Sequence, residues 1–169
     1  MSDHFTSLVK EFGPAVYRQC FGMLGSRADA EEAAQDVFMI IHNKLGTFRG
    51  DSALSTWIYT ITFRCCLRRR AVKQPRFVSI DDDQCACEIP DSTPNAEAHA
   101  IGRETTLSLL ERIALLPAHE AAAITLFYME EKNYTEIGAI LDMPSGTVAT
   151  TLHRARRHLH ALIGNREED

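Results

Sequence analysis

Residues 134–162 constrain the fold more than any other part of the chain, because two helical patterns meet there around a proline. Pro144 disfavours helical geometry at the residue before it, so the first helix should end near Asp142 and Met143. Ser145 follows the proline and is expected to cap the N-terminus of a second helix. A short helix, a tight turn and a second helix make up the helix-turn-helix pattern.

The second of these helices has an apolar side and a polar side. Apolar residues recur at the three- and four-residue spacing of a buried stripe. These are Val148, Leu152, Ala155 and Leu159. The opposite side carries Thr147, Thr150, His153, Arg154 and Arg157. Arginine binds guanine or phosphate through paired N–H groups, and Thr and His reach base edges, so this side fits the major groove of DNA. An ordinary helical hairpin with a solvated basic face is the alternative.

The length of the chain and its apolar pattern limit the classes of protein to which it can belong. Its 169 residues are enough for one domain or two small ones. No apolar run approaches the roughly 20 residues that a membrane-spanning helix needs, and the polar N-terminus does not resemble a signal peptide. We therefore expect a cytoplasmic protein without direct membrane insertion, whose five cysteines are reduced thiols.

Charge is distributed unevenly along the chain, which has a formal net charge of −5. Basic residues dominate positions 46–76, where Asp51 is the single acid. Acidic residues dominate positions 77–104, where Arg103 is the single basic residue. A basic block followed by an acidic block indicates two partners of opposite charge.

The N-terminal half predicts three helices, over residues 5–24, 28–45 and 53–72. The first should break near Gly13 and restart at Pro14, because proline is tolerated in the first turn of a helix. The second helix has a polar face that includes Asp29, Glu32, Gln35, Asp36 and Met39. A methionine exposed among acids indicates a partner surface, since methionine packs adaptably. A solvated face is the alternative.

Aromatic and arginine side chains alternate in the third helix and in the loop before it. Phe48 and Arg49 lie in a glycine-flanked loop, where the ring can stack on an unpaired base or tuck under its own loop. The helix adds Tyr59, Phe63, Arg64, Arg68, Arg69 and Arg70. Rings stack on bases and guanidinium groups bind phosphate, so this surface suits nucleic acid. Arginines near a helix C-terminus also relieve the helix dipole, but this many exceed that need.

The remainder of the chain predicts a linker and a second helical domain. Residues 73–96 are rich in proline and acidic residues, which is typical of a flexible domain boundary. Helices are expected over residues 97–115 and 118–129, ahead of the helix-turn-helix. The predicted fold class is therefore all-α, with two small helical domains at 1–72 and 97–165 joined by the linker.

The sequence contains no recognisable motif of catalysis. It has no Ser-His-Asp order, phosphate-binding loop, His-Glu-x-x-His or paired catalytic carboxylates, so we predict no enzyme, no cofactor and no small-molecule substrate. Cys85 and Cys87 form a Cys-x-Cys pair to which His99 could add a ligand, but a structural zinc site needs four ligands. We therefore predict no metal, with a metal or thiol sensor as the alternative.

Three stretches together resemble the extracytoplasmic-function group of bacterial sigma-70-type sigma factors. They are DAEEAAQDVF at 29–38, TFRGDSALSTWIY at 47–59, and the stretch 116–159 with its LP opening, YTEIGAIL and GTV segments. Their order and spacing are more specific than a helix-turn-helix. The resemblance implies a region 2-like bundle and a region 4-like helix-turn-helix domain, without the middle domain of housekeeping sigma factors.

The resemblance implies a role for each surface. Residues that would grip the clamp helices of the largest polymerase subunit are Asp29, Glu32, Gln35, Asp36 and Met39. Residues that would capture flipped bases of the −10 element and hold the melted strand are Phe48, Arg49, Ser52, Tyr59, Phe63, Arg64, Arg68 and Arg70. Residues that would read the −35 element are Thr147, Thr150, His153 and Arg154, with Arg156 and Arg157 nearer phosphate. The acidic linker would enter the active-site cleft of the polymerase.

Some positions depart from the family pattern. The family commonly has a basic residue, Ser and Arg where Ala149, Thr150 and Thr151 stand, and it often has Arg-Asn at 63–64 and Asp at 68. Two positive charges are therefore missing from the recognition helix, and the salt dependence of DNA binding should be shallower by roughly one unit per lost contact. A sigma-like decoy that binds only an anti-sigma factor is one alternative, and a repressor or activator that works without polymerase is another.

The resemblance also names the expected partners. These are core RNA polymerase, through its largest and second-largest subunits, promoter DNA and an anti-sigma factor. An acidic protein with two small basic patches should bind free DNA poorly. When polymerase holds the protein, both patches act together, because tethering raises the effective concentration of each.

Overall fold

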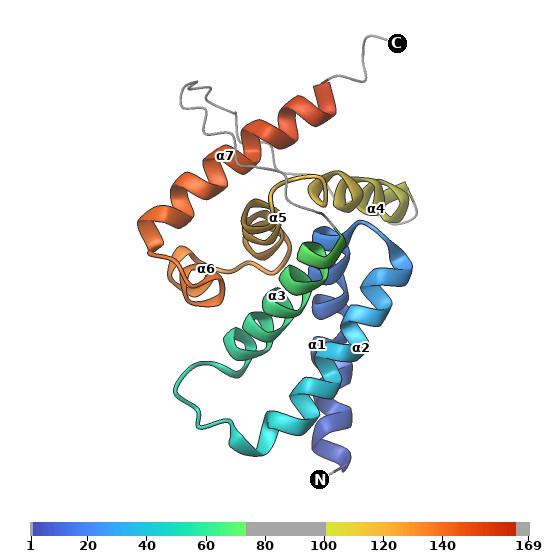
Figure 1. The fold of residues 1–169 in the computed structure, drawn as a ribbon, viewed down its shortest axis with the longest axis vertical. Coiled ribbons are helices and arrows are strands. Elements are labelled where there is room, and N and C mark those ends of the chain that lie inside the picture. Colours follow the sequence, from blue (N-terminus) through green and yellow to red (C-terminus); the bar gives the residue numbers. More distant parts are fainter. Residues whose placement is uncertain (1, 74–100, 165–169) are drawn as a thin grey trace.

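The computed structural model describes residues 2–73 and 101–164, and most of this described part is helical. The helices are α1 (Ser2–Leu24), α2 (Arg27–Lys44), α3 (Leu54–Lys73), α4 (Ile101–Ile113), α5 (Ala118–Ile124), α6 (Tyr134–Leu141) and α7 (Ser145–Gly164). A 3-10 turn at Leu45–Thr47 follows α2, and a π-helical segment at Thr125–Met129 follows α5. Figure 1 shows α1 to α3 as one bundle and α4 to α7 beside it.

The predicted all-α fold with two helical domains is confirmed. The predicted linker lies outside the described residues from position 74 onward. In the part of the chain that the structure describes, none of the helices has both the length and the apolar character that a membrane crossing requires.

The three N-terminal helices bury apolar faces against one another. Their core includes Val16, Val37, Ile41 and Ile58. The Ser26 hydroxyl caps α2 by accepting a hydrogen bond from the Asp29 backbone N–H at 3.4 Å. The predicted break in α1 is wrong, because the helix continues through Pro14. The missing backbone N–H is tolerated since α1 packs against α2, α3, α4 and α5, and these contacts offset the lost hydrogen bond.

Three cysteines lie inside this N-terminal bundle. Cys20 and Cys66 are fully buried, and the Cys66 thiol donates to the Cys20 sulfur at 3.6 Å. Cys65 is buried beside them. The hydrogen bond that the two thiols share, together with burial, raises the pKa of the Cys20 thiol, and burial raises the pKa of Cys65. All three are free cysteines.

The C-terminal helices include an unusual turn between α5 and α6. The π-helical segment Thr125–Met129 widens the end of α5, and Glu131 then takes a left-handed conformation with φ 51°. Asn133 starts α6 through a capping box. Its side chain accepts from the Glu136 N–H at 2.9 Å, while the Glu136 carboxylate accepts from the Asn133 N–H at 2.9 Å.

The turn of the helix-turn-helix depends on a close backbone approach. Asp142 ends α6 in the left-handed conformation with φ 57°. A Cβ atom at Gly138 would lie only 2.6 Å from the Met143 carbonyl oxygen, so glycine is required there. Ser145 is the first residue of α7 and not its cap as expected. The Pro144 carbonyl starts the helix, accepting from N–H groups three and four residues later at 2.9 and 3.2 Å.

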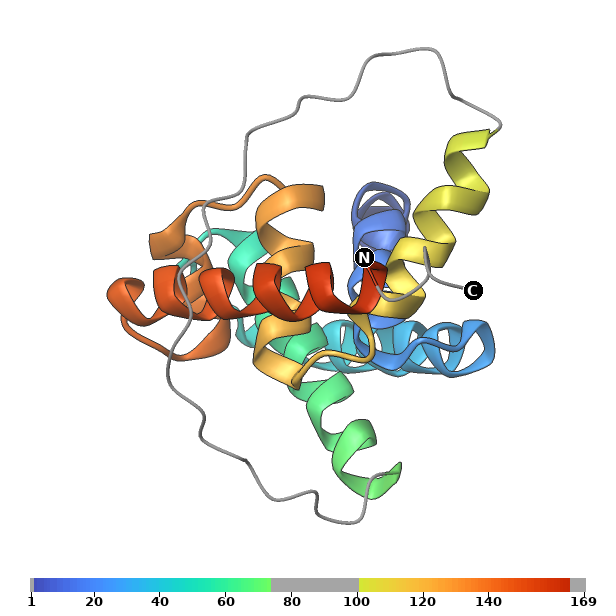
Figure 2. The ribbon, with the colours of Figure 1, turned by 90° about the horizontal axis from the view of Figure 1, so that it is seen from above.

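The two groups of helices pack directly against each other. Helices α4 and α5 contact α1, and α6 contacts α3 (Figure 2). The two groups lie close together at Gly22 of α1, where a Cβ atom would lie 2.7 Å from Thr125 Oγ1 and 3.1 Å from Leu110 Cδ2. A side chain at Gly22 would therefore push the two domains apart.

Candidate nucleic-acid interface

Helix α7 presents the polar face that the sequence predicts. Its apolar stripe packs against α5 and α6, with Val148, Leu152 and Ala155 fully buried. The opposite face is open to solvent at Thr147, Thr150, His153 and Arg154. The side chains that the sequence predicts to face DNA are therefore accessible to a partner.

The two remaining predicted residues of this face, Arg156 and Arg157, are half-buried. Arg156 Nε donates to the Tyr128 hydroxyl at 2.7 Å, and its guanidinium carbon lies 5.5 Å from the centre of the Tyr128 ring. Stacking of this kind fixes the direction of a guanidinium group. Arg156 is thus held at the flank of α7 by Tyr128.

Glu120 of α5 lies beneath this face and was not singled out in the sequence. It is 6% exposed, its Oε2 lies 2.6 Å from His158 Nδ1, and its Oε1 lies 4.0 Å from Arg154 Nε. The carboxylate therefore holds two side chains of α7 against α5. The sequence alone does not predict this contact, because an isolated Glu in an apolar helix can be exposed, form an ion pair or cap a helix.

Thr151 does not contribute to the open face. It is 2% exposed, and its hydroxyl lies 3.9 Å from the Met143 sulfur. The adjacent Ala149 is exposed but uncharged. Neither position supplies the positive charge that the family pattern commonly has there.

The loop before α3 carries the first of the predicted −10 residues. The ring of Phe48 lies 5.0 Å from that of Trp57, with an interplanar angle of 42°. Arg49 and Ser52 are exposed on the same loop. Phe48 is therefore half-buried under its own loop in this arrangement, with Trp57 as its neighbour.

Helix α3 is buried on two sides, and this separates the other predicted −10 residues into two groups. Arg64 and Arg68 are exposed. Tyr59 and Phe63 are each only 4% exposed, and α6 and α5 pack on the helix that carries them. The Phe63 ring makes an edge contact with His119 of α5 at 5.2 Å. In this arrangement the C-terminal domain covers the Phe63 ring, which the sequence predicts to contact a base.

Arg70 is also held by the C-terminal domain. Its guanidinium donates to the Leu116 carbonyl oxygen at 2.7 Å, and burial lowers its pKa. The other terminal nitrogen is buried and has no hydrogen-bond partner among the described residues. A half-buried arginine that meets a neutral carbonyl and no carboxylate is incompletely satisfied.

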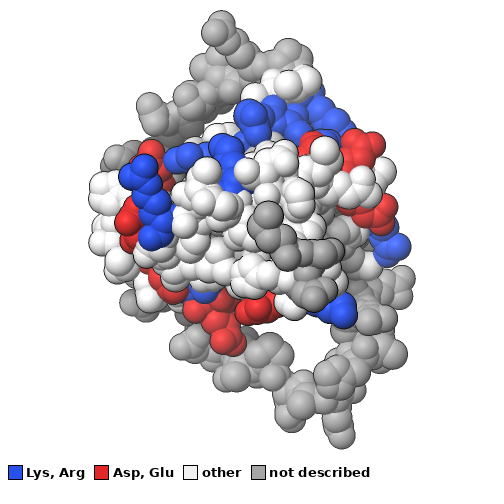
Figure 3. Space-filling view, turned by 90° about the horizontal axis from the view of Figure 1, so that it is seen from below, with Lys and Arg blue, Asp and Glu red and all other residues white. Residues whose placement is uncertain are grey.

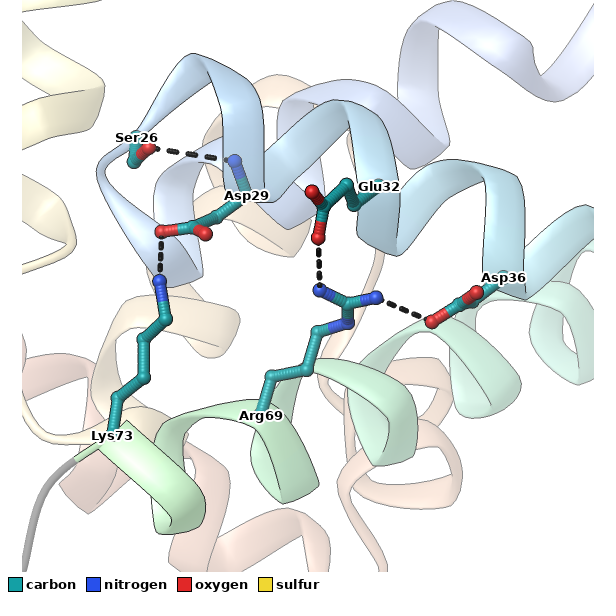
Figure 4. A network of polar contacts seen from close by, with 6 residues as sticks. All are labelled: Ser26, Asp29, Glu32, Asp36, Arg69 and Lys73. Carbon is teal, nitrogen blue, oxygen red and sulfur yellow. Dashed lines mark hydrogen bonds and ion pairs between the residues drawn. The ribbon is translucent and has the colours of Figure 1, made fainter.

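The polar face of α2 is paired with basic residues of α3 (Figure 4). Arg69 contacts both Glu32, at 3.3 Å, and Asp36. Lys73 contacts Asp29, and this hydrogen bond lowers the pKa of the Asp29 carboxyl. The acids expected to meet polymerase are therefore already partly neutralised within the domain.

The other two residues of that face are open to solvent. Gln35 is exposed. Met39 is a stronger indication of a partner surface, because 65% of this apolar side chain's surface is accessible. The structure thus places Met39 where a partner helix could pack on it.

Charge is arranged in patches on the molecular surface. Figure 3 shows a band of lysine and arginine side chains along the upper edge and smaller basic and acidic groups side by side around the rest of the margin, with a largely uncharged middle. No group of three potential metal ligands occurs within residues 2–73 and 101–164. Cys85, Cys87 and His99 lie outside the described residues.

Two family models match the chain. "Sigma-70 region 2" matches residues 8–75, and "Sigma-70, region 4" matches residues 106–159. The first contains α2 and α3, and the second contains the helix-turn-helix.

Curated relatives carry the same family names. ECF RNA polymerase sigma factor SigW of Bacillus subtilis is 29% identical over 169 residues, covering 95% of this chain and 89% of that protein. The ECF RNA polymerase sigma-E factor of Escherichia coli is 32% identical over 134 residues, covering 76% of this chain and 70% of that protein. RNA polymerase sigma factor YlaC of Bacillus subtilis is 30% identical, covering 99% and 96%.

Two solved structures share the fold. One is the sigma factor RpoE in complex with the anti-sigma factor NepR from Bartonella quintana, with a TM-score of 0.66 and 21% identity, covering 95% of this chain and 97% of that chain. The other is CnrH in complex with the cytosolic domain of CnrY, with a TM-score of 0.65 and 20% identity, covering 98% and 91%.

Proposed function

The chain belongs to the extracytoplasmic-function group of sigma-70-type RNA polymerase sigma factors, and on that premise we propose which of its surfaces carry out promoter-specific initiation. As a member of this group it directs transcription by core RNA polymerase at promoter DNA. The open face of α7 carries the proposal, because it already has the form of a groove-reading helix.

The −35 element is read by α7 of the C-terminal domain, residues 97–165. Thr150, His153 and Arg154 contact base edges, and Thr147 stands at the start of the helix. Arg156 and Arg157 bind phosphate at its flank. In support, the first four of these side chains are exposed on one face and Arg156 is fixed by Tyr128. A base contact by Arg154 carries most of the sequence preference, because arginine binds guanine through two parallel hydrogen bonds.

The −10 element is captured by the N-terminal domain, residues 1–72. The residues involved are Phe48, Arg49, Ser52, Tyr59, Phe63, Arg64, Arg68 and Arg70. Unstacking a base costs a few kcal/mol, and an aromatic pocket lined by arginines offsets that cost. The protein performs this work by binding, without covalent chemistry of its own.

Core polymerase is bound through the polar face of α2, at Asp29, Glu32, Gln35, Asp36 and Met39. The exposed Met39 beside a row of acids supports this assignment. Basic residues of a clamp helix would replace Arg69 and Lys73 as partners of these acids. The acids thus exchange one set of ion pairs for another, which keeps the desolvation cost of docking low.

An anti-sigma factor is the further partner that we propose. One protein with the same fold, the sigma factor RpoE, is solved in complex with the anti-sigma factor NepR. Because polymerase and DNA act inside the cell, the chain is expected to work in the cytoplasm.

Transcription reconstituted from purified parts tests the function. Core polymerase, sheared host DNA and the full chain are combined, and the 5′ ends of the transcripts are sequenced. Start sites should appear that depend on the chain and share −10 and −35 motifs. A decoy would bind polymerase or an anti-sigma factor but yield no transcripts, and a simple repressor would shift operator DNA without polymerase. Replacing Thr150 and Arg154 together should remove the −35 motif from the recovered start sites.

A further inference from the structure

Arg18 of α1 and Tyr59 of α3 form a binding site for a pair of negatively charged oxygens. Glu130 of the C-terminal domain occupies it. Arg18 Nε lies 2.7 Å from Glu130 Oε1, and a terminal nitrogen of Arg18 lies 3.1 Å from Oε2. The Tyr59 hydroxyl donates to the same Oε2 at 3.0 Å. Two parallel N–H bonds are also the geometry in which arginine binds phosphate.

The environment of Glu130 shows that this contact belongs to the packed interface between the domains. The side chain of Glu130 is 6% exposed, and that of Arg18 is 38% exposed. Hydrogen bonding to Glu130 raises the pKa of Arg18, and burial raises the pKa of the Tyr59 phenol. Glu130 reaches the site from the end of the π-helical segment, where its backbone N–H bonds to the Thr125 carbonyl at 3.3 Å.

The residues around this site form one surface of the N-terminal domain. Tyr59, Phe63 and Arg70 are all covered by the C-terminal domain, and one Arg70 nitrogen is buried without a partner among the described residues. Separation of the domains would expose an anion site, an aromatic ring and an unsatisfied arginine together. A melted DNA strand offers a phosphate and a base at such a surface.

We propose that Arg18 and Tyr59 bind a backbone phosphate of the promoter strand, and that Glu130 occupies this phosphate site while the two domains are packed together. The carboxylate offers two oxygens to Arg18, as a phosphodiester does, and therefore competes with the strand. This assignment rests on the proposed −10 role of α3 and adds Arg18 as a DNA contact. It also makes the C-terminal domain an intramolecular inhibitor of the −10 surface.

Two readouts on the full chain test the proposal without polymerase. Amide hydrogen exchange over residues 55–66 reports whether α3 is covered. Fluorescence anisotropy with a labelled dT12 oligonucleotide at low salt reports phosphate and stacking contacts. This probe is chosen because it requires no knowledge of the promoter sequence. The variants are Glu130→Gln, Arg18→Gln and Arg18→Lys. Glu131→Gln is the matched control, because it removes the same charge from an exposed neighbour.

The variants should separate opening of the interface from binding of the strand. Glu130→Gln should increase both exchange and dT12 affinity by roughly tenfold, the effect of losing one charge-assisted contact. Arg18→Gln should increase exchange similarly but bind dT12 no better than the wild type. Arg18→Lys should bind less tightly than Glu130→Gln, since it keeps the charge without the paired N–H groups. Glu131→Gln should change neither readout.

Two results would overturn the proposal. If Arg18→Gln gained as much dT12 affinity as Glu130→Gln, Arg18 would not be a phosphate ligand. If Glu130→Gln behaved like Glu131→Gln, Glu130 would not hold the domains together. Thermal melting followed by circular dichroism verifies that each variant is folded. Failure of the wild-type chain in the reconstituted transcription assay would instead contradict the proposed function. That assay is independent of the exchange and anisotropy measurements.

Discussion

The two proposed DNA-binding surfaces differ in how accessible they are to DNA in the packed structure. The face of α7 is open, with Thr150, His153 and Arg154 exposed. The corresponding surface of α3 is covered, with Tyr59 and Phe63 each 4% exposed. The difference shows that one reading surface depends only on its own helix, whereas the other also depends on how the two domains are arranged. Mutations in the first should act directly, and mutations in the second should act through the interface.

Arg154→Ala should have the largest effect, because its side chain is exposed and needs no opening of the domains. Loss of a paired contact with guanine costs about 1–3 kcal/mol. Transcription from a chain-dependent promoter should therefore fall by roughly tenfold or more, as measured by run-off assays. His160→Ala, at an exposed position of α7 with no assigned role, is the control. Equal transcription from both variants would remove Arg154 from the −35 surface.

Gly22→Ala should open the covered surface by steric pressure and not by charge. The added Cβ would lie 2.7 Å from Thr125 Oγ1 when the domains are packed. Overpacking of this kind costs about 1–3 kcal/mol, while alanine favours the helix itself. Hydrogen exchange over residues 55–66 should rise about tenfold. Gly13→Ala is a matched control in the same helix, because nothing lies within 4 Å of its added Cβ. If the two variants exchanged alike, the packed arrangement would not persist in solution.

Arg68→Ala sharpens the comparison within α3, since Arg68 is exposed while Tyr59 is not. Its loss should weaken dT12 binding in the Glu130→Gln background and reduce the slope of log affinity against log salt by about 0.7, the value for one phosphate contact to a single strand. Lys10→Ala removes the same charge from an exposed part of α1 and should leave the slope unchanged. An unchanged slope in Arg68→Ala would mean that Arg68 faces away from the strand.

Mild acid should loosen the covered surface, and this is the smallest effect expected. Burial lowers the pKa of His119, which contacts the Phe63 ring, below its ordinary value of 6.5. Its contribution to packing is present above pH 6.5 and is lost as the pH falls through the lowered pKa, because protonation then favours the open or unfolded chain. Exchange over residues 55–66 should rise on acidification in the wild type. His119→Gln should flatten this dependence, and an identical pH curve would exclude His119 as its source.

Amphipathic patterns were sufficient to predict most helices but not their surroundings. Helices α2 and α3 begin and end within about one residue of the predicted ranges, because each carries a clear apolar stripe. The break predicted at Pro14 was wrong, because packing with four other helices overrides a local preference. The π-helical segment after α5 has no known pattern in the sequence that would reveal it.

The candidate site residues likewise divide into those set by a local helical pattern and those set by packing between distant parts of the chain. The exposed face of α7 could be predicted because it depends on the spacing within one helix. The cover over Tyr59 could not, because it arises from contacts between residues far apart in the chain. Arg18 and Glu130 are separated by 112 positions, and neither stands in a local pattern that points to the other. Glu130 lies between the helix predicted over residues 118–129 and the helix-turn-helix that begins at residue 134.

The buried thiols of the N-terminal bundle have a practical consequence. Cys20, Cys65 and Cys66 are shielded, and two of them have raised pKa values, so they should resist alkylation in the folded chain. Their rate of modification by a small electrophile would therefore report how often the packing around them opens, and it can be followed in the folded chain without any label.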